Sequence, residues 1–260
     1  MLECVINVSE GRNHAILDAL TQVCSGDLLD VHTDSDHNRS VFTVLGEEAP
    51  RRLTQAAILA LSLSQHAGVH PRLGVVDVVP FVPLVNSSMQ DAQIARDEFA
   101  TWVTGEFNIP CFLYGTNHTL PEIRKNAWTT VMPDIGPHVP HPTAGAVCVG
   151  VREPLVAYNL WLEDVDLATT RRIASAVRTA HIRTLGLQVG AFTQVSVNLI
   201  EPMISGPNDV FNAVSQHAAV HHAELVGLLP ASVLATIPRA RWEDLDVSVE
   251  QTIEWRVTNR

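Results

Sequence analysis

Residues 66–85 read HAGVHPRLGVVDVVPFVPLV and join a predicted helix, Ala49–Gln65, to a predicted strand. The strand is expected over Gly74–Val85, because a short valine-rich run after a glycine is typical of a buried strand. Pro71 fixes its own φ and favours extended geometry at His70. A histidine held at such a junction suits general acid–base chemistry near neutral pH. Residue spacing alone does not distinguish a catalytic His70 from an ordinary loop histidine, so both interpretations remain.

Outward from this segment, strands and helices alternate along the chain. Strands are expected at Leu2–Val8, Asp27–Val31, Val41–Gly46, Ile109–Tyr114, Leu155–Leu162, Phe192–Ile200 and Leu225–Leu229. Further helices are expected at His14–Val23, Ser87–Phe107, Pro121–Trp128, Asp166–Leu185, Pro207–Glu224 and Ala231–Ile237. Consecutive strands separated by short polar turns favour an α+β fold, with sheets covered by helices, over a purely parallel series.

The pattern restarts near residues 150–155, which predicts two similar α/β halves, 1–152 and 153–260. A weak internal repeat supports this division. The segments VINV at 5–8 and VSVNL at 195–199 are each followed by a polar loop and a predicted helix. The second half is the shorter one and is predicted to be a reduced copy.

Composition excludes several classes of protein. The 260 residues carry 17 Lys+Arg, 28 Asp+Glu and a net charge of −11, with 46% hydrophobic residues. Such a chain is neither disordered nor equipped to bind nucleic acid through its phosphates. No window reaches the roughly 18 apolar residues of a membrane span, and the N-terminus lacks the basic region of a signal peptide. Four scattered cysteines are typical of a reducing compartment. We therefore expect a cytoplasmic protein without membrane partners.

Residues 34–39, DSDHNR, place carboxylates, an imidazole, an amide and a guanidinium between two predicted strands. These residue types favour turns, so a plain hairpin loop is one interpretation. The other is a recognition loop, in which Arg39 grips a carboxylate and Asn38 binds an amide.

The histidine spacings allow a metal site as one interpretation. His66 and His70, and likewise His217 and His221, show i,i+4 spacing, and His222 follows His221 directly. However, no glutamate follows in the H-E-x-x-H manner. A solvated helix face is the expectation for His217 and His221, and no metal is expected.

Residues 132–144 contain four prolines and are predicted to form a long loop. The neighbouring run Asp134–Ala146 could present backbone N–H groups to a ligand, or it could be a rigid connection. The chain has no phosphate-binding glycine motif and no G-x-S-x-G, so nucleotide-dependent and esterase functions are poorly supported.

Several segments, in order along the chain, resemble the glutamate formiminotransferases, including the transferase half of formiminotransferase-cyclodeaminase. They are ECVINVSEGRN at 3–13, LLDV at 28–31, DHNRSV at 36–41, HAGVHPRLGVVDVVPFVP at 66–83, LYG at 113–115, LPEIR at 120–124, DIGP at 134–137 and QVSVNL at 194–199. The resemblance implies two ferredoxin-like subdomains whose sheets face each other with helices outside. It also implies a homodimer and transfer of a formimino group from N-formimino-L-glutamate to tetrahydrofolate in histidine degradation.

The resemblance also implies roles for single residues. The family's catalytic histidine falls on His70, as general base and then general acid, and its folate loop falls on Gly136–Gly145. The residues themselves add further candidates. Asp30 or Asp36 could orient His70, and because a chain with net charge −11 has few cations, Arg39 and Arg72 are candidates to bind substrate carboxylates. The full set of expected substrate-binding residues is Asp36, His37, Asn38, Arg39, Arg72, Gly136, Pro137, His138, Gly145, Arg152 and Asn198.

The chain departs from the family at Ala144, where members commonly carry tryptophan, and at Val69, where they carry glutamate. The segment before Gln194 is also shorter. Two alternatives therefore stay open: a homologue that binds folate or a small anionic ligand without this activity, or an enzyme using another one-carbon donor such as formyl-folate.

Overall fold

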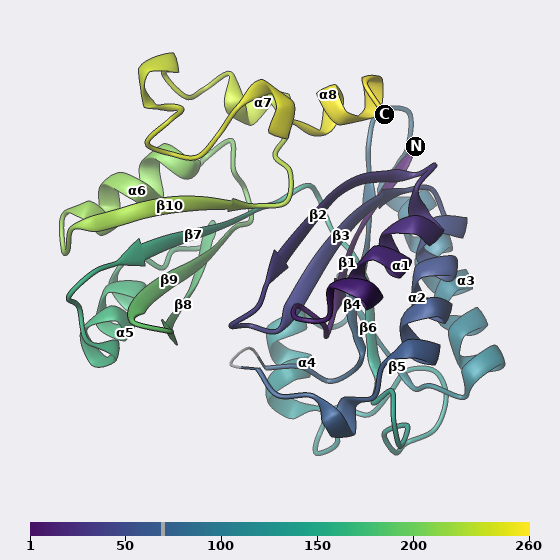
Figure 1. The fold of residues 1–260 in the computed structure, drawn as a ribbon. Coiled ribbons are helices and arrows are strands. Elements are labelled where there is room, and N and C mark those ends of the chain that lie inside the picture. Colours follow the sequence, from purple (N-terminus) through teal and green to yellow (C-terminus); the bar gives the residue numbers. More distant parts are fainter. Residues whose placement is uncertain (69–70) are drawn as a thin grey trace. The chain divides into compact units, whose positions relative to one another are not determined.

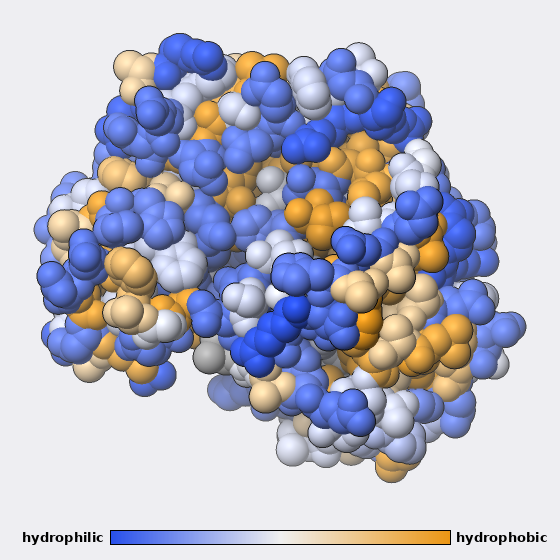
Figure 2. All heavy atoms as spheres, in the orientation of Figure 1, coloured by the Kyte–Doolittle hydropathy of each residue, from blue (hydrophilic) through white to orange (hydrophobic). Residues whose placement is uncertain are grey.

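A computed structural model describes residues 1–68 and 71–260. The chain divides into two compact units, Met1–Glu153 and Pro154–Arg260 (Figure 1). Hydrophilic side chains cover much of the face in view, with smaller hydrophobic groups between them (Figure 2). In the described residues, no helix combines the length and the apolar character that crossing a membrane requires.

The first unit is built on a β-α-β-β-α-β core. Its elements are β1 (Leu2–Val8), α1 (His14–Cys24), β2 (Leu28–Asp34), β3 (Arg39–Leu45), α2 (Glu48–Ala60) and β4 (Val76–Pro83). These strands lie in the order β2-β3-β1-β4, and neighbours are antiparallel. This connectivity is that of the ferredoxin-like fold.

The same sheet continues past β4 with α3 (Met89–Phe107), β5 (Cys111–Tyr114), α4 (Leu120–Asn126) and β6 (Val147–Val151). Strand β6 lies between β4 and β5 and is parallel to both. Helices α1, α2 and α3 pack on one face through a large apolar core, whereas α4 contributes to a smaller cluster around Phe112 and Ile123. β4 is therefore the strand that joins the antiparallel and parallel parts of the sheet.

Local sequence signals set where the helices begin. Asn13 accepts the Ile16 N–H at the start of α1. Ser88 and Asp91 form a reciprocal capping box at the start of α3, as Thr119 and Glu122 do for α4. Each cap satisfies backbone donors that a helix leaves unpaired.

The second unit repeats the β-α-β-β-α-β connectivity. It contains β7 (Val156–Leu162), α5 (Leu167–Ala176), β8 (Ile182–Val189), β9 (Phe192–Leu199), α6 (Pro207–Ser215) and β10 (Val220–Val226), in the antiparallel order β10-β7-β9-β8. Short helices α7 (Ala231–Leu234) and α8 (Ile253–Thr258) follow, with single 3-10 turns at Leu63–Gln65, Arg239–Arg241 and Val249–Gln251 elsewhere in the chain. The predicted α+β class is confirmed.

Several expected elements were wrong. The helix predicted over Ala49–Gln65 ends at Ala60, and strand β6 was not predicted. The helix predicted over Asp166–Leu185 ends at Ala176, and its last residues belong to β8. The helix predicted over Pro207–Glu224 ends at Ser215. The misassigned residues of β8 pair with the next strand, β9, and those of β10 pair with the distant β7. In both cases strand pairing overrides local helix propensity.

Candidate functional site

One edge of the first sheet brings together the segments singled out in the sequence. Val8, at the end of β1, lies opposite Ser40 in β3 and Val76 in β4. The next residue, Ser9, donates its N–H to the Val75 carbonyl at 2.7 Å and its hydroxyl to the Gly74 carbonyl at 2.8 Å. The loop after β1, the β2–β3 turn and the residues before β4 are therefore neighbours at this edge.

The β2–β3 turn is organised by Asp34. Its Oδ1 accepts the backbone N–H groups of Asp36 and His37, each at 2.8 Å. Its Oδ2 lies 3.3 Å from Nδ1 of the buried His37. Asn38 then adopts a positive φ of 48°. An aspartate that accepts bonds two and three residues ahead forms a turn of its own, so Asp36 lies exposed at the tip while His37 is held inside.

The Asn38 side chain ties this turn to two other segments. Its Oδ1 accepts the Gly11 N–H at 2.9 Å, and its Nδ2 donates to the Ala67 carbonyl at 2.9 Å. The same nitrogen lies 3.3 Å from Nδ1 of His66. The amide predicted to bind substrate is thus engaged by the protein itself.

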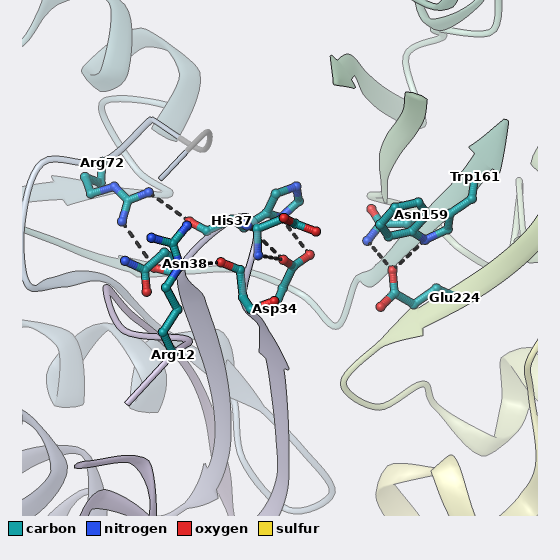
Figure 3. Close-up of polar contacts among 10 residues, drawn as sticks. Arg12, Asp34, His37, Asn38, Arg72, Asn159, Trp161 and Glu224 are labelled. Atoms are coloured by element: carbon teal, nitrogen blue, oxygen red, sulfur yellow. Dashed lines mark hydrogen bonds and ion pairs between the residues drawn. The ribbon is translucent and has the colours of Figure 1, made fainter. Parts of the chain in front are cut away.

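Arg72 fastens the segment before β4 to the same turn (Figure 3). Its Nη2 donates to the His37 carbonyl at 3.0 Å and its Nη1 to the Asn38 carbonyl at 3.3 Å. A side chain on Gly68 would overlap the His37 carbonyl oxygen, so glycine is required there. Gly68 and Arg72 are thus both fixed against the turn. His70, with Val69, lies outside the described residues.

The buried carboxylate of Asp77 holds the segment before β4 in place. Asp77, 1% exposed, accepts the Leu73 N–H at 2.7 Å and an Arg124 N–H at 2.5 Å. Arg124 also donates to the Pro71 carbonyl at 2.6 Å. Sequence reasoning missed this pair. The available signal was an aspartate inside an apolar strand, because a buried charge in a protein is normally paired.

Asp77 also acts on the guanidinium groups of Arg39 and Arg72. Burial lowers the pKa of Arg39 to about 10, and the negative charge of Asp77 opposes that shift. Burial likewise lowers the pKa of Arg72, again opposed by Asp77. One carboxylate is therefore the main counter-charge for several cations.

The end of the long loop packs on the same segment. The Ala146 N–H donates to the Leu73 carbonyl at 3.0 Å, and the Val75 N–H donates to the Ala144 carbonyl at 2.9 Å. Gly145 has a positive φ of 72°, and a Cβ there would overlap the Leu73 carbonyl oxygen. The structure thus brings Gly145 to the edge that carries Arg72.

The remaining predicted residues lie elsewhere. Gly136 packs against Thr104 and Pro110, near the end of α3, and Pro137 and the exposed His138 follow it. Arg152 follows β6, and its backbone N–H donates to the Phe81 carbonyl, towards the far end of β4. Asn198 is an exposed residue of β9 in the second unit.

The histidines of the second unit do not lie on a helix face. His221 and His222 belong to β10, with their Nδ1 atoms 2.7 Å apart. The ring of His222 stacks on Trp161, whose Nε1 donates to Glu224 at 2.9 Å. His217 lies beyond the end of α6. Across the part of the chain that the structure describes, no cluster of three or more potential metal ligands occurs.

Comparison with known proteins shows the family of this chain. Residues 1–152 match the family model described as the formiminotransferase domain, N-terminal subdomain. The chain is 32% identical to the glutamate formimidoyltransferase of Streptococcus pyogenes serotype M1, over 91% of each protein. The chain belongs to the formiminotransferase family.

Two further relatives carry names from the same family. The glutamate formimidoyltransferase of Thermoplasma acidophilum is 31% identical over 92% of this chain and 91% of its own length. The formimidoyltransferase-cyclodeaminase of Mus musculus is 29% identical, and the match spans 90% of this chain but 51% of that protein. The sheet edge described above lies wholly within the residues that match the formiminotransferase model.

Proposed function

We propose that this chain transfers the formimino group of N-formimino-L-glutamate to N5 of tetrahydrofolate, a one-carbon step in histidine degradation. The observation that carries the proposal is the match over nine-tenths of both chains to a protein named glutamate formimidoyltransferase. The sheet edge supports it, because the segments that resemble the family pack together there through Asn38, Arg72 and Asp77.

In the reaction, the N5 amine of tetrahydrofolate attacks the formimino carbon and gives a tetrahedral intermediate. Breaking the bond from that carbon to the glutamate nitrogen then releases glutamate. One proton leaves N5 and one reaches the departing nitrogen, so a single group able to accept and return a proton serves both steps. We assign this role to His70, on the basis of its His-Pro-Arg motif.

Tetrahydrofolate acts as a co-substrate, and the segment Gly136–Gly145 is assigned to binding it. Substrate-binding roles for Asp36, His37, Arg39 and Arg72 belong to the same proposal, and a homodimer is its assembly state. Size-exclusion chromatography with light scattering measures that state directly.

The test is a transfer assay with purified protein, N-formimino-L-glutamate and tetrahydrofolate, in which the absorbance of formiminotetrahydrofolate is followed. Replacement of His70 by alanine is expected to lower turnover roughly 10²–10⁴-fold. His217→Ala, an exposed histidine of the second unit, is the control and should retain wild-type turnover. An unchanged rate in His70→Ala would contradict the assigned role.

A folate titration separates the alternatives. The five tryptophans supply a fluorescence signal. If folinate does not bind even at millimolar concentration, both folate-dependent hypotheses fail. If folate binds but formiminoglutamate gives no product, a binding protein or another one-carbon donor is favoured.

A further inference from the structure

The loop between β1 and α1 is held rigidly at the sheet edge. Oε1 of Glu10 accepts the backbone N–H groups of Gly11, Arg12 and Asn13, at 2.7 to 2.9 Å. A side chain on Gly11 would overlap the Asp34 carbonyl oxygen, so the loop lies directly against the β2–β3 turn. The position of Arg12 is therefore set by its backbone.

The Arg12 side chain is fixed at one point and available at another. Its Nε donates to the Ser35 carbonyl at 2.7 Å. Within residues 1–68 and 71–260, its two terminal nitrogens have no hydrogen-bond or ion-pair partner, and the residue is exposed. Arg12 also lines a shallow depression with Glu10, Asn13, His14, Asn38, Gln65 and Ala67. Figure 3 shows its guanidinium in front of the turn.

The neighbouring cations are engaged differently. Arg72 uses its terminal nitrogens on the carbonyls of His37 and Asn38, and Arg124 bonds to Asp77 and to the Pro71 carbonyl. Arg12 is thus the cation of this edge that is best placed to meet a ligand from solvent.

The charges around the depression favour an anion. Burial lowers the pKa of His66 and the positive charge of Arg72 lowers it further, whereas Glu10 raises it and Arg12 adds a smaller decrease. Arg12 also contributes to lowering the pKa of Arg72. The Glu10 carboxylate lines the same depression and its charge opposes these cations, but its Oε1 is directed to three backbone N–H groups and not to the Arg12 guanidinium.

We propose that Arg12 binds a carboxylate of the formimino donor in this depression. The proposal deepens, and rests on, the function proposed above. A guanidinium anchored through Nε presents its two terminal nitrogens side by side, which is the geometry that pairs bidentately with a carboxylate. A donor derived from glutamate carries two such groups.

The test compares Arg12→Gln and Arg12→Lys with wild-type protein, with Arg172→Gln as the matched control. Arg172 is an exposed arginine of α5 in the second unit. Arg12→Gln is expected to raise KM for formiminoglutamate roughly 10- to 100-fold, the loss that removing a charge-assisted bond produces. KM for tetrahydrofolate should stay unchanged. KM for formiminoglutamate in Arg12→Lys should lie between the values of wild type and Arg12→Gln, because lysine keeps the positive charge but lacks the planar guanidinium.

A binding measurement makes the result independent of turnover. Calorimetric titration with N-formyl-L-glutamate, which keeps both carboxylates, is expected to show the same loss of affinity in Arg12→Gln but not in Arg172→Gln. Thermal unfolding of both variants checks that they fold.

The two proposals can fail separately. If the wild type binds N-formyl-L-glutamate through Arg12 but transfers no formimino group, the proposed function falls and the carboxylate site stands. If transfer occurs and Arg12→Gln keeps both KM and affinity, the carboxylate site is refuted. If the wild type does not bind N-formyl-L-glutamate at millimolar concentration, the carboxylate site is refuted as well.

Discussion

Asp77→Asn is expected to destabilise the first unit strongly, because Asp77 is almost fully buried and bonds to Arg124. Breaking a buried ion pair from one side costs about 3–5 kcal/mol. Asparagine retains an oxygen that can accept the Leu73 N–H, and the Arg124 side chain is 20% exposed, so we expect the low end, about 3 kcal/mol. At roughly 2–4 °C per kcal/mol, Tm should fall by about 6–12 °C.

Urea unfolding followed by circular dichroism measures this loss, with Asp18→Asn on the exposed face of α1 as the control. The control should stay within about 0.5 kcal/mol of wild type. Adding Arg124→Met to Asp77→Asn should recover part of the lost stability, since the uncompensated guanidinium is then gone. A loss below about 1 kcal/mol in Asp77→Asn would refute the view that this carboxylate supports the edge.

Two further predictions concern the segments on either side. Backbone donors hold the pKa of Glu10 below its usual value although burial opposes them, so its contribution to stability is present above the unfolded pKa and is lost as pH falls through the folded one. Glu10→Gln should therefore flatten the acid side of the stability profile measured by urea midpoints from pH 7 to pH 3, and parallel profiles would contradict this. Gly145→Ala combines a positive φ with overlap at the Leu73 carbonyl and should cost about 1–3 kcal/mol. Gly190→Ala has a positive φ of 57° but open space, so it should cost less, and equal losses in the two would show that the overlap is unimportant.

Much of the fold could be predicted because its signals are local. Caps such as Asn13 and Ser88 mark where helices begin, and valine-rich runs mark the central strands. The wrong predictions concern segments whose secondary structure is decided by pairing with another strand. Val147–Val151 follows a proline-rich loop, and it becomes a strand by pairing with β4 and β5. Residues 182–189 become β8 by pairing with β9, and buried and exposed side chains alternate only at the start of that strand.

In the site, too, local sequence predicted some features, whereas others depend on tertiary contacts. The chemistry of residues 34–39 and 66–74 was visible in the sequence, and the described residues 66–68 and 71–74 do meet the turn at 34–39 at one edge. What could not be read was which polar groups bond to the protein itself: the Asn38 amide and the Arg72 guanidinium do so extensively. The exposed guanidinium of Arg12 could not be predicted from the sequence, because its position depends on a loop geometry set by Gly11 and Glu10.

The order in which the edge is assembled bears on how the protein is made. Leu73 and Gly74 are held by residues 144–146, which leave the ribosome among the last of the first unit. A nascent chain that ends before residue 144 has β1 to β4 available but lacks the donor to the Leu73 carbonyl and the acceptor of the Val75 N–H. Since domains generally fold as units during synthesis, the edge is expected to become competent to bind ligand only once β6 has emerged. Chains stalled before that point should expose this surface to chaperones rather than to substrate.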